Sequence, residues 1–179
     1  MSYELEWADL PEPAATARSR FEACSDLGDR CVHVPQCLNE YETLTAAYRF
    51  HLNIAGMANC RDGMRRTGMI YHAASQPFPD WPFQGFNDWQ SADQSRRDAY
   101  IAAERAASAQ TIPGMLGIPE FKLTSNGPWL VGAREIDEAL DCYQASSPSL
   151  RAELEENDLW VAWLDWLRQT VHHGGFTVG

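Results

Sequence analysis

Apolar positions follow a helical period over residues 158–173, and at about 100° per residue they share one side of a helix. That side holds three tryptophans among seven apolar residues: Leu159, Trp160, Trp163, Leu164, Trp166, Leu167 and Val171. So wide a face needs a large apolar partner surface, because burial of such a face supplies most of a helix's stability. We therefore expect a tryptophan-rich C-terminal helix packed on the protein's own core, with Trp163 almost fully buried.

Capping residues predict where the helices near this one begin. Ser147 followed by Pro148 is typical of a helix start, with serine as the cap and proline at the first position. Asn157 can cap the tryptophan helix that follows, so we expect a break between the two helices there. Helical spacing predicts one more helix over residues 134–144, with its apolar side facing inward.

The first two thirds of the chain carry weaker helix signals. Apolar residues after Gly56 lie at helical spacing and predict a helix there. Ser91 with Gln94 forms a capping box for a helix that runs to about residue 110 and has a mostly alanine face. Residues 11–38 are rich in turn formers, so we expect irregular chain there with one short helix near residues 14–24.

Alternation of apolar and polar residues predicts the strands. Residues 48–54 alternate and predict a strand with one buried face. Residues 69–73 predict a second strand, and the short helical link between the two suggests neighbours in one sheet. Residues 121–123 and 129–131 predict a hairpin joined through Ser125-Asn-Gly127, where Asn-Gly supplies the positive φ of a tight turn.

Together these elements predict a single α+β domain over residues 1–179. The sheet should be small and mostly antiparallel, with residues 176–178 as an edge strand, and four or five helices should pack on it. A chain of 179 residues is a natural length for one domain. Its hydrophobic content of 45% is ordinary for a globular chain and can build a sizeable core.

Charge narrows the classes of partner. The chain has 25 acidic and 14 basic residues and a formal net charge of −11. Nucleic-acid binders need a basic surface that displaces counterions, so this balance argues against nucleic acid and fits a basic partner surface. The N-terminal segment lacks the apolar core of a signal peptide, and no run reaches the ~18 apolar residues of a membrane span. We therefore expect a cytoplasmic protein that binds neither nucleic acid nor membrane.

The cysteines raise the question of a metal site. There are five, and an odd number in a cytoplasmic chain predicts reduced thiols and no complete disulfide framework. Cys24, Cys31, His33 and Cys37 together offer four zinc-type ligands, but structural zinc sites usually use pairs spaced by two to four residues. The spacing here matches no common zinc pattern. We expect structural thiols, no metal and no other cofactor.

Two segments carry a resemblance. The first is Phe50-His-Leu-Asn-Ile-Ala-Gly-Met57, followed by Cys60-Arg61, Met64 and Gly68-Met69. The second is Lys122-Leu-Thr-Ser-Asn-Gly-Pro-Trp-Leu-Val131, followed by Glu135-Ile136 and Ala139-Leu140. Together they resemble a group of uncharacterised small proteins of actinobacteria and their phages. Relatives have Ser-Asn-Asp-Gly-Trp where this chain has Ser125-Asn-Gly-Pro-Trp129, which changes the turn. The resemblance covers less than half of the chain, implies a bacterial or phage origin and carries over no catalytic residue.

The long loop before residue 91 offers the clearest binding signal. It places five aromatic residues among prolines and aspartates: Phe78, Trp81, Phe83, Phe86 and Trp89. Long loops without regular structure are often functional, and aromatic residues dominate binding hot spots. Two interpretations stay open at this point. Either the aromatics are exposed for binding, or they tuck down as a small core cluster beside the main one.

The polar face of the first alternating strand offers a second candidate site. It carries Arg49, His51 and Asn53, and His72 would approach His51 if the strand at residues 69–73 paired beside it. A histidine pair with these neighbours could hold an anion or perform acid–base chemistry near neutral pH. The alternative is a solvated or helix-covered sheet face without a chemical role.

These observations favour a non-enzymatic interaction protein. We expect the aromatic loop to meet a protein partner, with Asp80 and Asp88 at its rim steering a basic surface. The runner-up hypothesis is a small hydrolase-like enzyme or an anion- or ligand-binding protein that uses Arg49, His51 and Asn53 with His72. The chain contains no phosphate-binding glycine loop, nucleophile elbow or paired Cys-x-x-Cys that would name a reaction.

Overall fold

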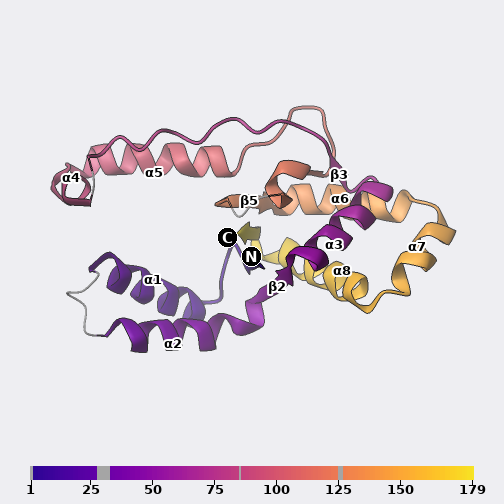
Figure 1. Cartoon of the computed structure of the whole chain (residues 1–179), viewed down its shortest axis with the longest axis horizontal. Coiled ribbons are helices and arrows are strands. Elements are labelled where there is room, and N and C mark those ends of the chain that lie inside the picture. Colours follow the sequence, from indigo (N-terminus) through magenta and orange to yellow (C-terminus); the bar gives the residue numbers. More distant parts are fainter. Residues whose placement is uncertain (1, 28–32, 85, 125–126) are drawn as a thin grey trace.

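The fold is α+β, built from a four-stranded antiparallel sheet, a two-stranded parallel pair and helices on several sides (Figure 1). A computed structural model describes residues 2–27, 33–84, 86–124 and 127–179. In chain order its elements are β1 (Ser2–Trp7), α1 (Glu12–Leu27), α2 (Val34–Thr45), η2 (Ala46–Tyr48), β2 (Arg49–Asn53), α3 (Ile54–Arg66), β3 (Ile70–Tyr71), α4 (Phe86–Ser91), α5 (Gln94–Ser108), β4 (Ile118–Pro119), η3 (Glu120–Leu123), β5 (Trp129–Gly132), α6 (Ala133–Ala145), α7 (Pro148–Glu155), α8 (Asp158–Thr170), η4 (Val171–His173) and β6 (Gly175–Val178).

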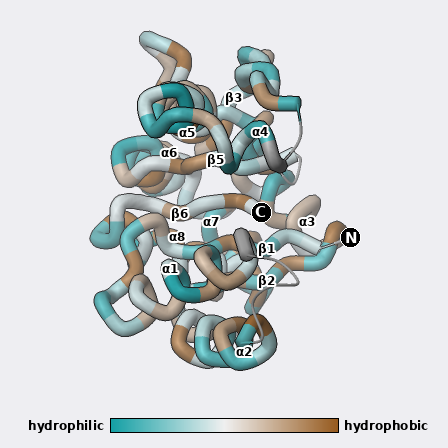
Figure 2. Tube along the Cα trace, turned by 90° about the vertical axis from the view of Figure 1, so that its left-hand side faces the viewer, coloured by the Kyte–Doolittle hydropathy of each residue, from teal (hydrophilic) through white to brown (hydrophobic). Residues whose placement is uncertain are grey.

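The four-stranded sheet joins the two ends of the chain. Its strand order is β2-β1-β6-β5, so the N-terminal and C-terminal strands lie side by side at its centre. Alternation along β1 gives the sheet two different faces. Tyr3, Leu5 and Trp7 are buried in the core, whereas Glu4 and Glu6 point to the opposite face. In Figure 2, β6 crosses the middle of the molecule, and hydrophobic positions lie along it and along β5.

The tryptophan helix α8 covers the buried face of this sheet. Trp163 is 0% exposed, and its ring centroid lies 5.6 Å from that of Phe50 on β2 and 6.0 Å from that of Phe176 on β6. Helix α3 packs beside α8, and a Cβ atom at Gly63 would meet the Trp160 ring at 2.6 Å. Only glycine at that position lets the two helices approach this closely. The predicted burial of Trp163 is confirmed.

Several other predictions from the sequence are also confirmed. The α+β class, the antiparallel sheet and the tryptophan-rich C-terminal helix are all present. Ser147 caps α7, and its Oγ accepts a hydrogen bond from the N–H of Leu150 at 3.3 Å. Asn157 caps α8, and its Oδ1 accepts from the N–H of Leu159 at 2.9 Å. Local side-chain chemistry therefore sets these boundaries.

The expectation for residues 11–38 is only partly right, because the short helix near residues 14–24 is present within the longer α1, whereas residues 34–38 are helical and not irregular. Most of that segment belongs to α1 and to the start of α2, which form a helical hairpin, and the described residues contain eight α-helices, more than the four or five expected. The small side chains of Ala14 and Ala17 on α1 are buried. Neither helix has a wide apolar stripe of its own, which is why the apolar pattern predicted only one short helix here.

The predicted arrangement of strands also needs correction. β3 does not pair with β2, because it forms a parallel pair with β4, in register Ile70 to Ile118. Residues 121–123 belong to the 3-10 helix η3 and not to a hairpin strand, and residues 125 and 126 of the predicted turn lie outside the described residues. β6 is not an edge strand, because it lies between β1 and β5. No helix in the described ranges has the length and apolar character needed to cross a bilayer.

We expect Trp163→Ala to lower the free energy of unfolding by about 3–5 kcal/mol, because it opens a large cavity between α8 and the sheet. Val161 lies on the same helix and is 37% exposed, so Val161→Ala should change that free energy by roughly 0.5 kcal/mol. Urea unfolding of the two variants measures both values. A loss below about 1 kcal/mol for Trp163→Ala would show that this face is not core.

Candidate functional site

The aromatic loop and α5 form a projecting unit that we call the arm, residues 72–110. Figure 1 shows the chain leaving β3, running in extended form beside α5 and returning through α4 and α5. Residues 72–82 have no regular secondary structure, and we call them the strap. Asp93 caps α5, and its Oδ1 accepts from the N–H of Arg96 at 2.8 Å. The predicted cap, Ser91, instead ends the short helix α4.

The base of the arm is fastened to the rest of the fold at two points. The ring of Phe78 packs on Trp129 of β5 with 4.7 Å between ring centroids, and it lies against the main core. Gln110 makes the second contact at the base of the arm, where its Oε1 accepts a hydrogen bond from the N–H of Gln76 at 2.6 Å. Its Nε2 donates to the carbonyl of Gln76 at 3.2 Å. The two chain segments that enter and leave the arm are thus tied together.

The outer part of the arm has an aromatic cluster of its own. We define the aromatic cluster as Trp81, Phe83, Trp89 and Tyr100. The Trp81 ring centroid lies 5.0 Å from that of Phe83, 5.3 Å from that of Trp89 and 5.1 Å from that of Tyr100. Phe83 is buried at its centre but does not belong to the main core. The cluster therefore holds the strap, α4 and α5 together without help from the sheet.

Arg96 fixes this cluster from the first turn of α5. Its guanidinium carbon lies 4.5 Å above the Phe83 ring, and Nη2 donates to the carbonyl of Pro82 at 2.6 Å. Nη1 is 3.9 Å from Asp88 Oδ1, while Asp88 Oδ2 accepts from the N–H of Gln84 at 2.8 Å. Asp88 thus has partners inside the arm, although 34% of its side chain stays exposed.

The five predicted aromatics divide between core and surface. Phe78 packs on the main core, Phe83 is buried in the aromatic cluster and Trp89 is half-buried there. Trp81 keeps 50% of its surface exposed although three rings contact it. Phe86 lies in α4, and its side chain is outside the described part of the structure. Neither of the two interpretations left open by the sequence holds for the whole loop.

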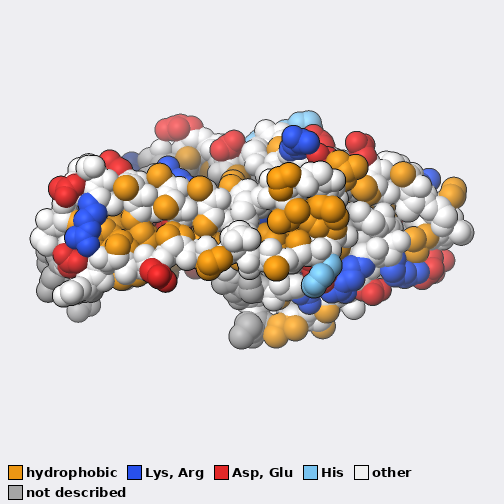
Figure 3. Space-filling model, turned by 90° about the horizontal axis from the view of Figure 1, so that it is seen from above, with side chains coloured by type: hydrophobic (Ala, Val, Ile, Leu, Met, Phe, Trp, Pro, Cys, Tyr) orange, Lys and Arg blue, Asp and Glu red, His pale blue; other side chains and the backbone are white. Residues whose placement is uncertain are grey.

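Helix α5 adds a long apolar surface to the arm. None of its residues is buried, and most of its alanines are exposed. Figure 3 shows hydrophobic side chains along the whole arm when the molecule is seen from above. Where the arm returns to the sheet, the exposed side chain of Met115 lines a pocket of about 240 Å³ together with Tyr71 and Glu135. Exposed apolar side chains on the arm, Trp81 at the tip and the alanines of α5, thus lie among polar and charged residues.

A buried ion pair lies behind that pocket. Lys122 is 0% exposed, and its Nζ donates to Glu135 Oε1 at 2.8 Å and to the carbonyl of Leu130 at 2.7 Å. Glu135 Oε2 accepts from the N–H of Gly132 at 2.8 Å. Burial lowers the pKa of Lys122 and raises the pKa of Glu135, and their mutual attraction opposes both shifts. The pair ties η3, β5 and α6 into one unit.

The second candidate site is not assembled as predicted. His51 faces Glu4 across the β1–β2 pair and is hydrogen-bonded to it. His72 is almost fully exposed beside β3, where its Nδ1 lies 3.7 Å from Glu120. Asn53 caps α3 by accepting from the N–H of Gly56 at 2.7 Å. Because β2 and β3 belong to different sheets, strand pairing does not bring the two histidines together.

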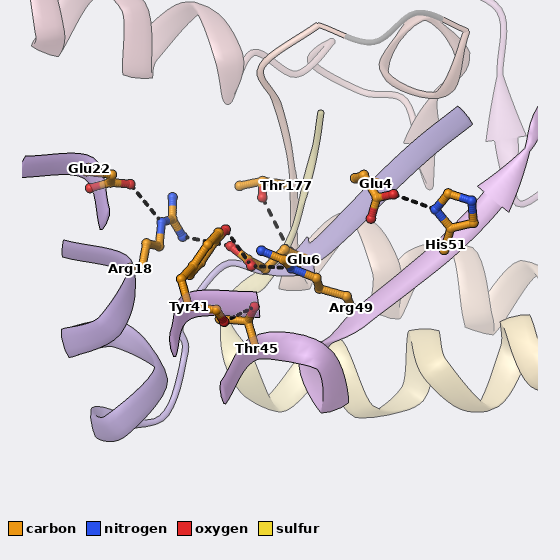
Figure 4. Close-up of polar contacts among 9 residues, drawn as sticks. All are labelled: Glu4, Glu6, Arg18, Glu22, Tyr41, Thr45, Arg49, His51 and Thr177. Carbon is orange, nitrogen blue, oxygen red and sulfur yellow. Dashed lines mark hydrogen bonds and ion pairs between the residues drawn. The ribbon is translucent and has the colours of Figure 1, made fainter. Parts of the chain in front are cut away.

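Arg49, the fourth residue of that site, belongs to a network on the polar face of the sheet. Its Nε donates to Glu6 Oε1 at 3.0 Å, and the Tyr41 hydroxyl donates to the same oxygen at 2.9 Å. Arg18 approaches the other oxygen of Glu6 at 3.4 Å. Burial and the neighbouring Glu6 carboxylate raise the pKa of Tyr41. This network joins the α1–α2 hairpin to the sheet, as Figure 4 shows.

The four metal-type ligands noted in the sequence are only partly described. Cys24 and Cys37 lie close together, with 2.8 Å between their sulfur atoms. Cys31 lies outside the described residues, and His33 is an exposed residue at the start of α2. Among the residues that the structure covers, no group of three or more side chains is placed to hold a metal ion.

Comparison with known proteins finds no family model, no curated protein and no solved structure that matches this chain. The resemblance to proteins of actinobacteria and their phages therefore stays a prediction. Function has to be inferred from the geometry of this chain alone.

Sequence reasoning missed the residues that hold these sites together. Arg96 and Tyr100 are one turn apart on α5, and their spacing was visible, but nothing local shows that the loop folds back onto them. Lys122 was placed in a strand, and a lysine in such a pattern is normally solvated. Its Glu135 partner is thirteen positions further on, so no short-range pattern connects the two.

We expect Lys122→Met to lower the free energy of unfolding by about 3–5 kcal/mol at pH 7, because it leaves the Glu135 carboxylate buried without a cation. The folded-state pKa of Glu135 then lies above its unfolded value, so the folded state binds the proton more tightly. The deficit should therefore shrink as pH falls toward the ordinary carboxyl range.

The control for that test is the double variant Lys122→Met/Glu135→Gln, which keeps an acceptor for the N–H of Gly132. It should recover most of the lost stability at pH 7 and show little extra pH dependence. Urea unfolding of the parent and both variants across pH provides the measurement. Equal losses in the two variants at every pH would show that the charge on Glu135 is not what the lysine stabilises.

Proposed function

We propose that this protein is a non-enzymatic, cytoplasmic interaction protein that binds a protein partner through the tip of the arm. The observation that carries the proposal is the half-exposed ring of Trp81 on a preformed aromatic cluster. Large, rigid aromatic side chains are common hot spots, because they bury much surface and lose little entropy on docking. In our proposal Trp81 is the main anchor.

The internal fastening of the arm supports this role. Arg96 and the aromatic cluster hold the strap against α5, so the tip is ordered before a partner arrives. A preformed tip avoids the entropy cost of ordering a loop on binding. Asp80 is exposed next to Trp81 and can meet a basic group, in keeping with the negative charge of the chain. Asp88 is less available for that role, because it already contacts Gln84 and Arg96 inside the arm.

The hydrolase-like or ligand-binding alternative has less support. It needs His51 and His72 to face one substrate, but His51 lies on β2 and His72 follows β3, which belongs to a different sheet. Arg49, His51 and Asn53 each already contact a neighbour in the fold: Glu6, Glu4 and the N–H of Gly56. The observed contacts of these three residues are those of a stabilised sheet face.

A photo-crosslinking amino acid at Asp80 tests the proposal while leaving Trp81 intact. In host cells we expect one discrete adduct with another protein. The adduct should fall about tenfold or more when Trp81→Ala is added, because loss of a hot-spot side chain costs about 2 kcal/mol or more of binding. Mass spectrometry of the adduct identifies the partner, and band intensity measures the change.

Ile54→Ala is the matched control for that experiment. Ile54 is 51% exposed, nearly the same fraction as Trp81, but lies on α3 outside the arm. This variant should leave the adduct unchanged, and the melting temperature of Trp81→Ala should fall by less than about 8 °C. Adducts of equal intensity in all three proteins, or none in the parent, would contradict the proposed role of Trp81.

A further inference from the structure

The α1–α2 hairpin aligns matching side chains along its length. Arg20 Nη1 lies 3.1 Å from Glu40 Oε1, and the rings of Phe21 and Tyr41 stack at 5.2 Å. One turn further from the sheet, Cys24 Sγ lies 2.8 Å from Cys37 Sγ. From Phe21 forward to Cys24 along α1, the partner moves back from Tyr41 to Cys37 along α2, as antiparallel packing requires. The register of the hairpin, set by several contacts, therefore places the two sulfur atoms together.

We propose that Cys24 and Cys37 form a reversible disulfide when the protein meets hydrogen peroxide, and that this bond clamps the α1–α2 hairpin. The sulfur–sulfur distance exceeds the ~2.05 Å of a disulfide, so small side-chain rotations would have to close it. Both residues are partly accessible, which lets a small oxidant reach them. Disulfides of this kind in reducing compartments are typically transient and redox-sensing.

Hydrogen peroxide can oxidise the two thiols to a disulfide in two steps. One thiolate attacks a peroxide oxygen, the O–O bond breaks, and a sulfenic acid and one water molecule result. The second thiolate then attacks the sulfenic sulfur, the S–O bond breaks, and the disulfide and a second water molecule form. The two sulfur atoms together lose two electrons, which reduce the peroxide, and both thiol protons end in water. A dithiol reductant reverses the bond by exchange.

The other described cysteines are placed differently. Cys60 is buried on α3, and burial raises the pKa of its thiol to about 12, so it carries almost no reactive thiolate. Cys142 is partly accessible on α6, a helix on the core side of the sheet. A mild oxidant should therefore join Cys24 to Cys37 before it bridges either of the others.

The disulfide would act on the contact between hairpin and sheet. Tyr41 lies one turn from Cys37 on α2, and its hydroxyl donates a hydrogen bond to Glu6 of β1. A covalent bond at the outer end of the hairpin limits how far α1 and α2 can separate, and so limits the loss of this contact. Closing a loop of this length should also raise the melting temperature by about 5–10 °C.

Peroxide treatment of the full chain, followed by intact-mass and peptide analysis, tests the proposal. We expect a loss equal to two hydrogen atoms, a peptide linking Cys24 to Cys37, and recovery of the original mass with dithiothreitol. Cys24→Ser and Cys37→Ser should each abolish the link and the rise in melting temperature. Cys142→Ser is the matched control and should change neither.

Three results would overturn the proposal. The first is the absence of a link between Cys24 and Cys37, whether the two thiols stay reduced or become sulfinic acids. The second is a peptide that joins Cys31 or Cys142 to one of the pair instead. The third is stoichiometric zinc in the purified protein that is lost in Cys37→Ser, because it would make the two thiols metal ligands.

Discussion

The tryptophan face of α8 has to be covered by apolar surface, and the antiparallel sheet supplies that cover. Trp163 is enclosed by side chains from β2 and β6, strands from distant parts of the chain. Trp160 comes so close to α3 that only the missing side chain of Gly63 makes room for it. The two terminal strands, β1 and β6, pair at the centre of the sheet, and both contribute core side chains, including Leu5 and Phe176.

The hairpin and the arm lie outside this constraint, and Figure 1 shows both extending away from the sheet. Each is stabilised by contacts of its own. The hairpin is held by the Glu6 network and by contacts between α1 and α2, such as the Phe21–Tyr41 stack. The arm is held by the aromatic cluster and by Arg96. Parts that the core does not depend on can carry exposed aromatic or reactive side chains without weakening the fold. That separation underlies both proposals.

Local signals predicted the elements near the C-terminus well. Ser147 and Asn157 cap their helices by bonding to backbone N–H groups only two or three residues away. The apolar residues of α8 follow a helical period that predicts a helix directly. The pairing of β3 with β4 was not predictable, because the whole arm separates Ile70 from Ile118 and no short pattern spans it. The division of the loop aromatics had the same cause. Composition showed that Trp81 and its neighbours would cluster or bind, but their exposure depends on how the strap folds back onto α5.

The central claim is that the arm presents a binding surface and does not complete the core. Gln76 and Gln110 are hydrogen-bonded to each other, so residues 79–109 can be replaced by a short glycine–serine linker that keeps Phe78 on Trp129. The most direct measurement is the thermal unfolding of this shortened chain, followed by the near-UV circular dichroism of the core tryptophans. We predict a cooperative transition with a melting temperature within about 8 °C of that of the parent. A shortened chain without a cooperative transition, or with a much lower melting temperature, would contradict this claim, because the arm would then be part of the core.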